Sequence, residues 1–333
     1  MLFAVLSTLM FNNANAEDTL ELLVMADWGG SPSKPYTTPD EVDTAKIMGE
    51  VAASLPSGSK AKAGIGIGDN FYNDGVKNAN DARFDETFEN VFTASSLENL
   101  PFYFICGNHD HYGNCTGEVA RNGVKRWNYP SDWYSLTFDV PSSSKKVQIL
   151  MFDTVIACGG TYDSLRECEE MGIKYEDCDL EPRGPKDPEL AANEWDWLTN
   201  ELKSSTADYL IVAGHYPVWS IAEHGPTSCL VKQLRPLLIQ YNVTSYWCGH
   251  DHTFQYIVEQ EYKNLGYLVT GSAHYCDSST AHKNDIPSNS LQFHGCKDGG
   301  FTRVSIDDSK LTFNHYYGDS DKPVFTASLD PRK

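Results

Sequence analysis

The segment AGIGIGDNFY, residues 63–72, joins a short apolar run to a group of polar side chains. Residues 63–67 have the length and composition of a buried strand, which is a short apolar run bounded by turn residues. Gly68 then allows a tight turn that aims the side chains after it. Asp69 and Tyr72 follow at once and offer oxygen donors. This succession of buried strand, glycine and donor side chain recurs along the chain and decides the fold.

Apolar runs of the same kind are found up to residue 250. They occupy residues 20–26, 63–67, 102–106, 147–152, 209–213 and 244–248. Helix-like stretches lie between several of them, at residues 40–54, 189–204 and 230–241. Strands that alternate with helices predict an α/β sheet covered by helices.

From residue 254 onward the pattern becomes rich in strands without matching helices. These strands are expected at residues 255–258, 267–269, 301–306 and 311–317. We expect them to form a second sheet packed on the first. No internal repeat or long linker interrupts the chain, so residues 17–333 are expected to form one domain. Residues 158–186, rich in glycine, proline and acids, are predicted to be a surface insertion.

The charge balance excludes several classes of partner. The chain of 333 residues has 26 Lys and Arg against 46 Asp and Glu, a formal net charge of −20. Nucleic acids and anionic membranes require a basic surface, so neither is expected as the main partner. An anionic substrate such as a phosphate ester would also be repelled at a distance. Its capture requires concentrated positive charge, such as a metal ion.

Potential metal ligands follow five of the predicted strands. Because ligands bind beyond the carboxyl ends of strands in open α/β sheets, these five strand ends are expected to converge on one site. Six of the ten histidines lie in or near these blocks. The blocks are Asp27, Gly68-Asp69-Asn70-Phe71-Tyr72, Gly107-Asn108-His109-Asp110, Gly214-His215 and Gly249-His250-Asp251-His252.

This number of donors exceeds the four that one tetrahedral ion needs, so we expect two metal ions. A carboxylate between two metals can bridge them, and Asp69 is our choice for the bridge. Tyr72 favours Fe(III), because a phenolate is a hard anionic donor that ionises only beside a strongly acidic ion. Asn108, His215 and His250 suit a softer divalent ion.

The five blocks together resemble those of the metallophosphoesterase superfamily, in its purple acid phosphatase branch. The small animal type, which is tartrate-resistant, is the most similar, notably over residues 213–227 and 229–238. The resemblance runs from about residue 22 to residue 325. It implies an αββα sandwich of two mixed sheets, in agreement with the two sheets expected above.

The resemblance also implies a role for each site residue. Fe(III) would be held by Asp27, Asp69, Tyr72 and His252. The divalent ion, iron or zinc, would be held by Asp69, Asn108, His215 and His250. His109 and His224 would contact the phosphate and the leaving oxygen as catalytic residues. A disulfide between Cys158 and Cys229 and a glycosylated Asn114 are implied as well.

The implied activity is that of an acid phosphatase acting on phosphate monoesters, small molecules or phosphoproteins. A metal-activated hydroxide would attack the phosphorus, and a protonated His109 or His224 would donate to the departing alkoxide. Two alternatives stay open. One is a metallophosphodiesterase, against which Tyr72 argues. The other is an iron-binding or redox glycoprotein, which would not need the pair His109 and His224.

The N-terminal residues and the cysteines indicate the compartment. Residues 1–16 resemble a signal peptide that ends in Ala-x-Ala, and no later stretch is apolar enough to span a membrane. We therefore expect a monomer that is secreted or resides in a lysosomal or vacuolar lumen. Among nine cysteines, local disulfides are expected for Cys168 with Cys178 and Cys276 with Cys296, whereas Cys106 and Cys248 are expected as buried thiols.

The remaining polar residues are given structural roles. Asp110 and Asp251 are expected to brace loop amides or histidines, and His111 is equally consistent with support of the site and with solvent exposure. Four further histidines are expected to be hydrogen-bonded core residues: His274, His282, His294 and His315.

Overall fold

The computed structural model describes residues 19–56, 59–161 and 181–332. Its strands form two seven-stranded sheets. The first sheet has the order β14-β13-β12-β1-β2-β3-β4. The second has the order β11-β9-β10-β8-β7-β6-β5. Both sheets are mixed. In the first, β1 to β4 run parallel, while β12, β13 and β14 pair antiparallel. In the second, β6, β7, β8 and β10 run parallel, while β5, β9 and β11 pair antiparallel.

Ten of the described strands follow the predicted runs closely, whereas those at residues 127–128, 134–139, 291–295 and 325–329 were not predicted. In the first sheet they are β1 Leu20–Met25, β2 Ala61–Ile67, β3 Phe102–Ile105, β4 Trp127–Asn128, β12 Gly300–Ile306, β13 Leu311–Tyr317 and β14 Phe325–Leu329. In the second sheet they are β5 Tyr134–Asp139, β6 Lys146–Met151, β7 Tyr209–Ala213, β8 Ser245–Cys248, β9 Phe254–Val258, β10 Gly266–Thr270 and β11 Leu291–Gly295.

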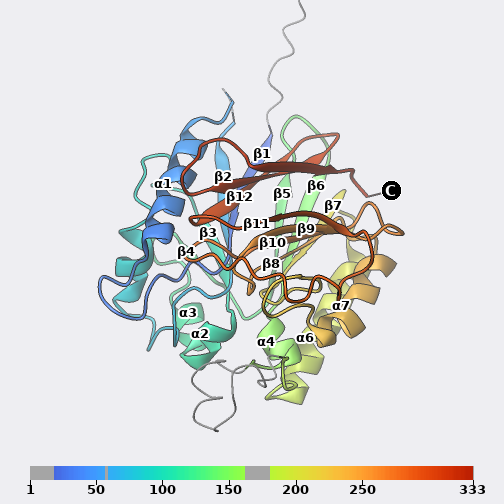
Figure 1. Ribbon diagram of the computed structural model, residues 1–333, viewed down its shortest axis with the longest axis horizontal. Coiled ribbons are helices and arrows are strands. Elements are labelled where there is room, and N and C mark those ends of the chain that lie inside the picture. The colour runs from blue at the N-terminus through green and yellow to red at the C-terminus, as the bar shows by residue number, and fades with distance from the viewer. Residues whose placement is uncertain (1–18, 57–58, 162–180, 333) are drawn as a thin grey trace, which may run out of the picture.

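Helices flank the two sheets on their outer sides (Figure 1). The long ones are α1 Pro39–Ala53, α6 Pro188–Ser204 and α7 Ser228–Gln240. The short ones are α2 Asn108–Tyr112, α3 Cys115–Ala120 and α4 Thr154–Cys158, with a π-helical turn over Phe84–Glu89. Helix α1 packs on the first sheet, and α6 and α7 lie at the opposite side of the molecule against the second (Figure 1). The predicted αββα sandwich is confirmed.

The composition of the second sheet was predicted wrongly. The C-terminal strands do not form a sheet by themselves, because β12 pairs antiparallel with β1 and extends the first sheet, whereas β9, β10 and β11 extend the second. The earlier strands are likewise divided between the sheets. An apolar run shows that a strand is buried but not which neighbour it pairs with, so the division could not be read from periodicity.

The long helices are placed by capping and by apolar spacing. In α1, Thr38 and Glu41 form a reciprocal capping box. In α6, Leu198 and Leu202 lie one turn apart and pack on the second sheet. In α7, buried leucines recur every four residues and join the same core, at Leu230, Leu234 and Leu238.

The disulfides agree with the prediction at two sites and differ at one. Cys158–Cys229 and Cys276–Cys296 are bonded, and Cys248 is a buried free thiol, as expected. Cys106, expected as a thiol, is instead bonded to Cys115. The turn after β3 and helix α2 bring the start of α3 back beside the strand end, a local fold that the apolar pattern does not reveal. The expected pair Cys168 and Cys178 lies outside the described residues.

Candidate metal centre

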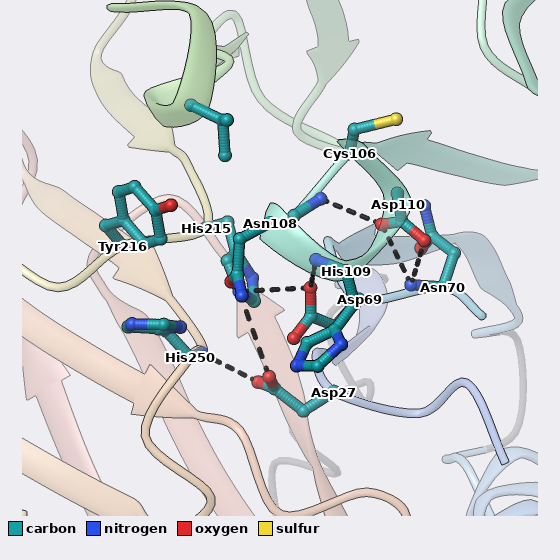
Figure 2. A network of polar contacts seen from close by, with 12 residues as sticks. Asp27, Asp69, Asn70, Cys106, Asn108, His109, Asp110, His215, Tyr216 and His250 are labelled. Atoms are coloured by element: carbon teal, nitrogen blue, oxygen red, sulfur yellow. Dashed lines mark hydrogen bonds and ion pairs between the residues drawn. The ribbon is translucent and has the colours of Figure 1, made fainter. Parts of the chain in front are cut away.

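The candidate centre lies where loops from both sheets meet, at the carboxyl ends of five strands. Asp27 follows β1, Asp69 follows β2, and Asn108 begins α2 directly after β3. From the second sheet, His215 follows β7, and His250 follows β8. Figure 2 shows these side chains pointing toward one another. The convergence expected from the sequence is present.

One group of donors surrounds the phenol oxygen of Tyr72. This oxygen lies 3.0 Å from Asp27 Oδ1, 2.9 Å from Asp69 Oδ2 and 3.1 Å from His252 Nε2. His252 Nε2 is also 3.5 Å from Asp27 Oδ1. The structure therefore places three oxygen donors and one imidazole nitrogen together.

A second group lies beside the first and shares Asp69 with it. His215 Nε2 is 3.1 Å from Asn108 Oδ1 and 3.3 Å from Asp69 Oδ1. The ligand atoms of Asp69, His215 and His250 all lie within 4.8 Å of one another, as do those of Asp27, Asp69 and His252. Asp69 thus presents one oxygen to each group, and the seven residues predicted as metal ligands form one cluster.

The backbone at this cluster is strained where the donors are aimed. Asp27 has φ 53°, Asp69 has φ 51° and His250 has φ 69°, which is the left-handed region that residues with a side chain rarely adopt. Strain of this kind costs on the order of 1–3 kcal/mol at each residue and is common at functional sites. A Cβ at Gly107 would lie 2.2 Å from Asp69 Oδ1, and one at Gly249 would lie 2.2 Å from Asp27 Oδ2. Only glycine permits these close approaches.

Asp110 and Asp251 act as braces, as expected. Asp110 is fully buried and accepts the main-chain N–H groups of Asn70, Phe71 and Gly107 at 2.8–3.0 Å. It thereby fixes the loop after β2 to the turn after β3. Asp251 accepts the main-chain N–H of His224 at 2.9 Å.

The two predicted catalytic histidines lie at the rim of the cluster. The main-chain N–H of His109 donates to Asp69 Oδ1 at 3.0 Å, and His109 Nδ1 is 2.7 Å from the carbonyl oxygen of Asn73. The ring of His224 stacks on that of His250, with centroids 4.1 Å apart and planes at 22°. His224 Nδ1 is buried and has no hydrogen-bond partner among the described residues.

Histidines outside the motif blocks divide into three kinds. His111 pairs with the buried Asp153 at 2.8 Å, which ties α2 to α4. His315 is a buried residue bonded to Thr302, as expected. His282 is instead half-exposed and pairs with Asp285, so the core prediction is wrong for it.

His274 lies at the candidate centre, which the sequence interpretation missed. Its ring stacks on that of Tyr72, with centroids 4.1 Å apart and planes at 26°. Its Nδ1 is 2.7 Å from the carbonyl oxygen of Asp27. The residue follows β10, which runs parallel to β8. The pattern of apolar run, glycine and histidine at residues 267–274 is the signal that could have identified it.

The electrostatics of the cluster fit bound cations. Burial and the carboxylates of Asp27 and Asp69 raise the pKa of the Tyr72 phenol well above its usual range. Burial lowers the pKa of His215, but the same carboxylates outweigh it and raise that pKa to about 10. Burial would raise the pKa of Asp69, yet the neighbouring imidazoles hold it well below its usual range. The buried carboxylates therefore require compensating positive charge.

The donor sets fit two unlike metal ions. The group around Tyr72 supplies mainly anionic oxygen, the donor type that hard ions prefer. The group around His215 supplies two imidazoles, one amide oxygen and one carboxylate, which suits divalent iron or zinc.

Comparison with known proteins agrees with this site. Residues 21–254 match the model of the calcineurin-like phosphoesterase family. Tartrate-resistant acid phosphatase type 5 of Oryctolagus cuniculus is 42% identical over 321 residues, which cover 95% of this chain and 93% of the rabbit protein.

Two solved structures share the fold at low sequence identity. GAP50 of Plasmodium, described as the anchor in the inner membrane complex, has a TM-score of 0.75 at 19% identity and covers 95% of this chain and 90% of its own. Purple acid phosphatase PPD1 from yellow lupin seeds has a TM-score of 0.62 at 15% identity, over 94% of this chain and 54% of its own. The chain therefore belongs to the calcineurin-like phosphoesterase family and, within it, to the tartrate-resistant purple acid phosphatases.

Proposed function

We propose that this protein hydrolyses phosphate monoesters at a dinuclear Fe(III)–M(II) centre, where M is iron or zinc. The observation that carries the proposal is the position of Asp69. Its Oδ2 lies 2.9 Å from the Tyr72 oxygen in one donor group, and its Oδ1 lies 3.3 Å from His215 Nε2 in the other. A carboxylate placed in this way can bridge two ions.

The proposed ligands follow the two donor groups. Fe(III) would be held by Asp27, Asp69, Tyr72 and His252, and the divalent ion by Asp69, Asn108, His215 and His250. When bound, such ions neutralise the charge of a phosphate group and lower the pKa of water to provide a nucleophile at acidic pH.

The residues of the chain orient the ligands and supply protons. His215 Nδ1 lies 3.0 Å from the carbonyl oxygen of Ile67, a contact that leaves Nε2 to face Asn108 and Asp69. His109 and His224, at the rim, are proposed to hold the proton that passes to the leaving oxygen. A protonated imidazole is favoured at acidic pH, in agreement with the proposed acid phosphatase activity.

The surroundings proposed for the protein follow from its cysteines and charge. Three disulfides among the described residues favour an oxidising compartment, and we propose that the protein is secreted or resides in a lysosomal or vacuolar lumen. None of the described helices is both long and apolar enough to cross a membrane. Because the chain has a net charge of −20, nucleic acid is not proposed as a partner. The protein is proposed to act as a monomer.

One experiment separates the acid phosphatase from its two alternatives. Purified full-length protein is analysed for metals, and its turnover of an aryl phosphate monoester and the matching diester is measured at pH 5. We expect two metal ions, monoester activity and a violet colour from phenolate-to-Fe(III) charge transfer. His215→Ala is expected to abolish turnover, whereas the matched His282→Ala variant retains it.

The other outcomes each point elsewhere. Faster turnover of the diester would indicate a phosphodiesterase. Bound iron without hydrolysis would indicate an iron-binding protein. A colourless protein with two zinc ions would contradict the assignment of Tyr72.

A further inference from the structure

The loop after β10 places His274 against two of the proposed ferric ligands. The His274 ring stacks on the ring of Tyr72 at a centroid distance of 4.1 Å. Its Nδ1 bonds the carbonyl oxygen of Asp27 at 2.7 Å. His274 belongs to neither donor group, so it contacts the ligands without being one of them.

Main-chain hydrogen bonds and a disulfide hold the loop that carries His274. The main-chain N–H of His274 donates to the same Asp27 carbonyl at 3.0 Å, and its carbonyl oxygen accepts from Thr38 Oγ1 at 2.7 Å. Two residues further on, the disulfide Cys276–Cys296 attaches the loop to the segment after β11. Because a carbonyl can only accept, Nδ1 must carry the proton, and this bond sets the tautomer and the ring plane.

Among the described imidazoles that contact the Tyr72 ring, His274 is the one that stacks on it. The imidazole of His109 is farther away and tilted, at 4.6 Å and 59°, and that of His252 meets the ring edge-on, at 5.9 Å and 85°. A cavity of about 370 Å³ adjoins Tyr72 and is lined by His274 and Asn73 among others. Without the imidazole, the face of the phenol ring would open to that cavity and to water.

We propose that His274 is a positioning residue that holds the Tyr72 phenol oxygen between Asp27 and Asp69 by stacking on its ring. The inference rests on the function proposed above and extends it to a residue outside the ligand set. The hydrogen bond to Asp27 orients the imidazole, and the stacked face then restricts the phenol ring. Supporting groups of this kind typically change metal affinity or activity by about 10- to 100-fold.

Three substitutions in the full-length, iron-loaded protein separate the stacked ring from the hydrogen bond. His274→Ala removes both, His274→Asn retains a side chain that can donate to Asp27, and His274→Phe retains a flat ring without the donor. His282→Ala is the control, because the His282 side chain is half-exposed and pairs with Asp285 rather than with a residue of the two donor groups. The measurements are the visible charge-transfer band, iron retained during dialysis against a chelator, and circular dichroism to verify folding.

We expect His274→Ala and His274→Asn to shift and weaken the band and to lose iron about 10-fold faster, while His274→Phe restores both properties. An Ala variant with the wild-type band and iron retention would overturn the proposal. So would a Phe variant that fails to restore them when it is folded. A wild-type protein that binds no iron or has no such band would contradict the proposed function itself. A failure of the His274 proposal alone would instead leave the wild-type iron and band in place.

Discussion

The phenol oxygen of Tyr72 lies 2.9 Å from Asp69 Oδ2 and 3.0 Å from Asp27 Oδ1. Three oxygens that would each carry negative charge when ionised are therefore within hydrogen-bond distance. In the absence of a cation, the phenol remains protonated, because burial and the two carboxylates raise its pKa. Ionisation of Tyr72 thus requires a bound cation of high charge, and the violet colour expected from the proposed Fe(III) centre would report on that event.

Replacement of Tyr72 by Phe is expected to abolish the violet colour while the fold persists. The phenyl ring keeps its contacts, but the donor that makes charge transfer possible is lost. The visible spectrum of the iron-loaded variant provides the measurement. Tyr209→Phe is the matched control, because the Tyr209 hydroxyl bonds the carbonyl oxygen of Asp307 outside the centre. A violet Tyr72→Phe protein would show that another residue supplies the phenolate.

Replacement of Asp69 by Asn is expected to remove metal from both positions. Asn tolerates the left-handed backbone that Asp69 adopts at φ 51°, so the local fold should be kept. It cannot offer two anionic oxygens, and we expect activity to fall by more than about 100-fold, since even groups behind the ligands account for 10- to 100-fold. Metal analysis and turnover at pH 5 test this.

Asp308→Asn, at an exposed position, is the control for the loss of one carboxylate. Full occupancy by two ions in Asp69→Asn would contradict a bridging role.

Much of the site could be predicted because its residues follow buried strands. An apolar run that ends in a donor marks both the strand end and the ligand, and this pattern located Asp27 and, with a glycine before the donor, Asp69, Asn108, His215 and His250. The assignment of strands to sheets could not be predicted, because pairing depends on neighbours that are distant in the chain. β12, for example, pairs with β1, although all strands of the second sheet lie between the two in the sequence.

Cys106 and His274 show a second limit. Cys106 ends an apolar run, as a buried thiol would, and only the path of α2 brings Cys115 within a Cα distance of 6.3 Å. His274 follows an apolar run and a glycine, but three residues after the glycine rather than directly. Its contact with Tyr72 depends on β10 lying parallel to β8, a relationship that the local sequence does not contain.

The buried carboxyl groups of Glu194, Glu41 and Glu118 are expected to contribute more to the stability of the folded protein at pH 5 than at pH 7. Burial, reinforced by Asp153, raises the pKa of Glu194 well above its usual range, and burial also raises that of Glu41 and Glu118. Above pH 4.5, the folded state therefore binds protons that the unfolded state has released. The contribution of each of these groups to stability falls as pH rises from that value toward its raised pKa, by about 1.4 kcal/mol per pH unit.

Glu194→Gln tests this pH dependence, because the amide keeps an oxygen to accept the main-chain N–H of Asp153 but cannot ionise. Relative to the wild type, its melting temperature should be higher at pH 7 than at pH 5, because the contribution of Glu194 to the pH dependence is removed. Glu189→Gln, at an exposed position of the same helix, should leave the wild-type pH dependence in place. Equal dependence in all three proteins would exclude Glu194 as a source.

Removal of the disulfide Cys106–Cys115 is expected to lower stability without emptying the metal centre. The bond joins residues 9 apart, and closing a loop of that size contributes about 2.5–3 kcal/mol in the chain-entropy model. The loop carries Asn108 and His109, but the buried Asp110 independently holds its turn through main-chain amides. The double variant Cys106→Ala with Cys115→Ala should therefore melt at a lower temperature, yet bind two ions and remain violet when folded. Loss of colour in the folded variant would show that the disulfide, rather than Asp110, positions this part of the site.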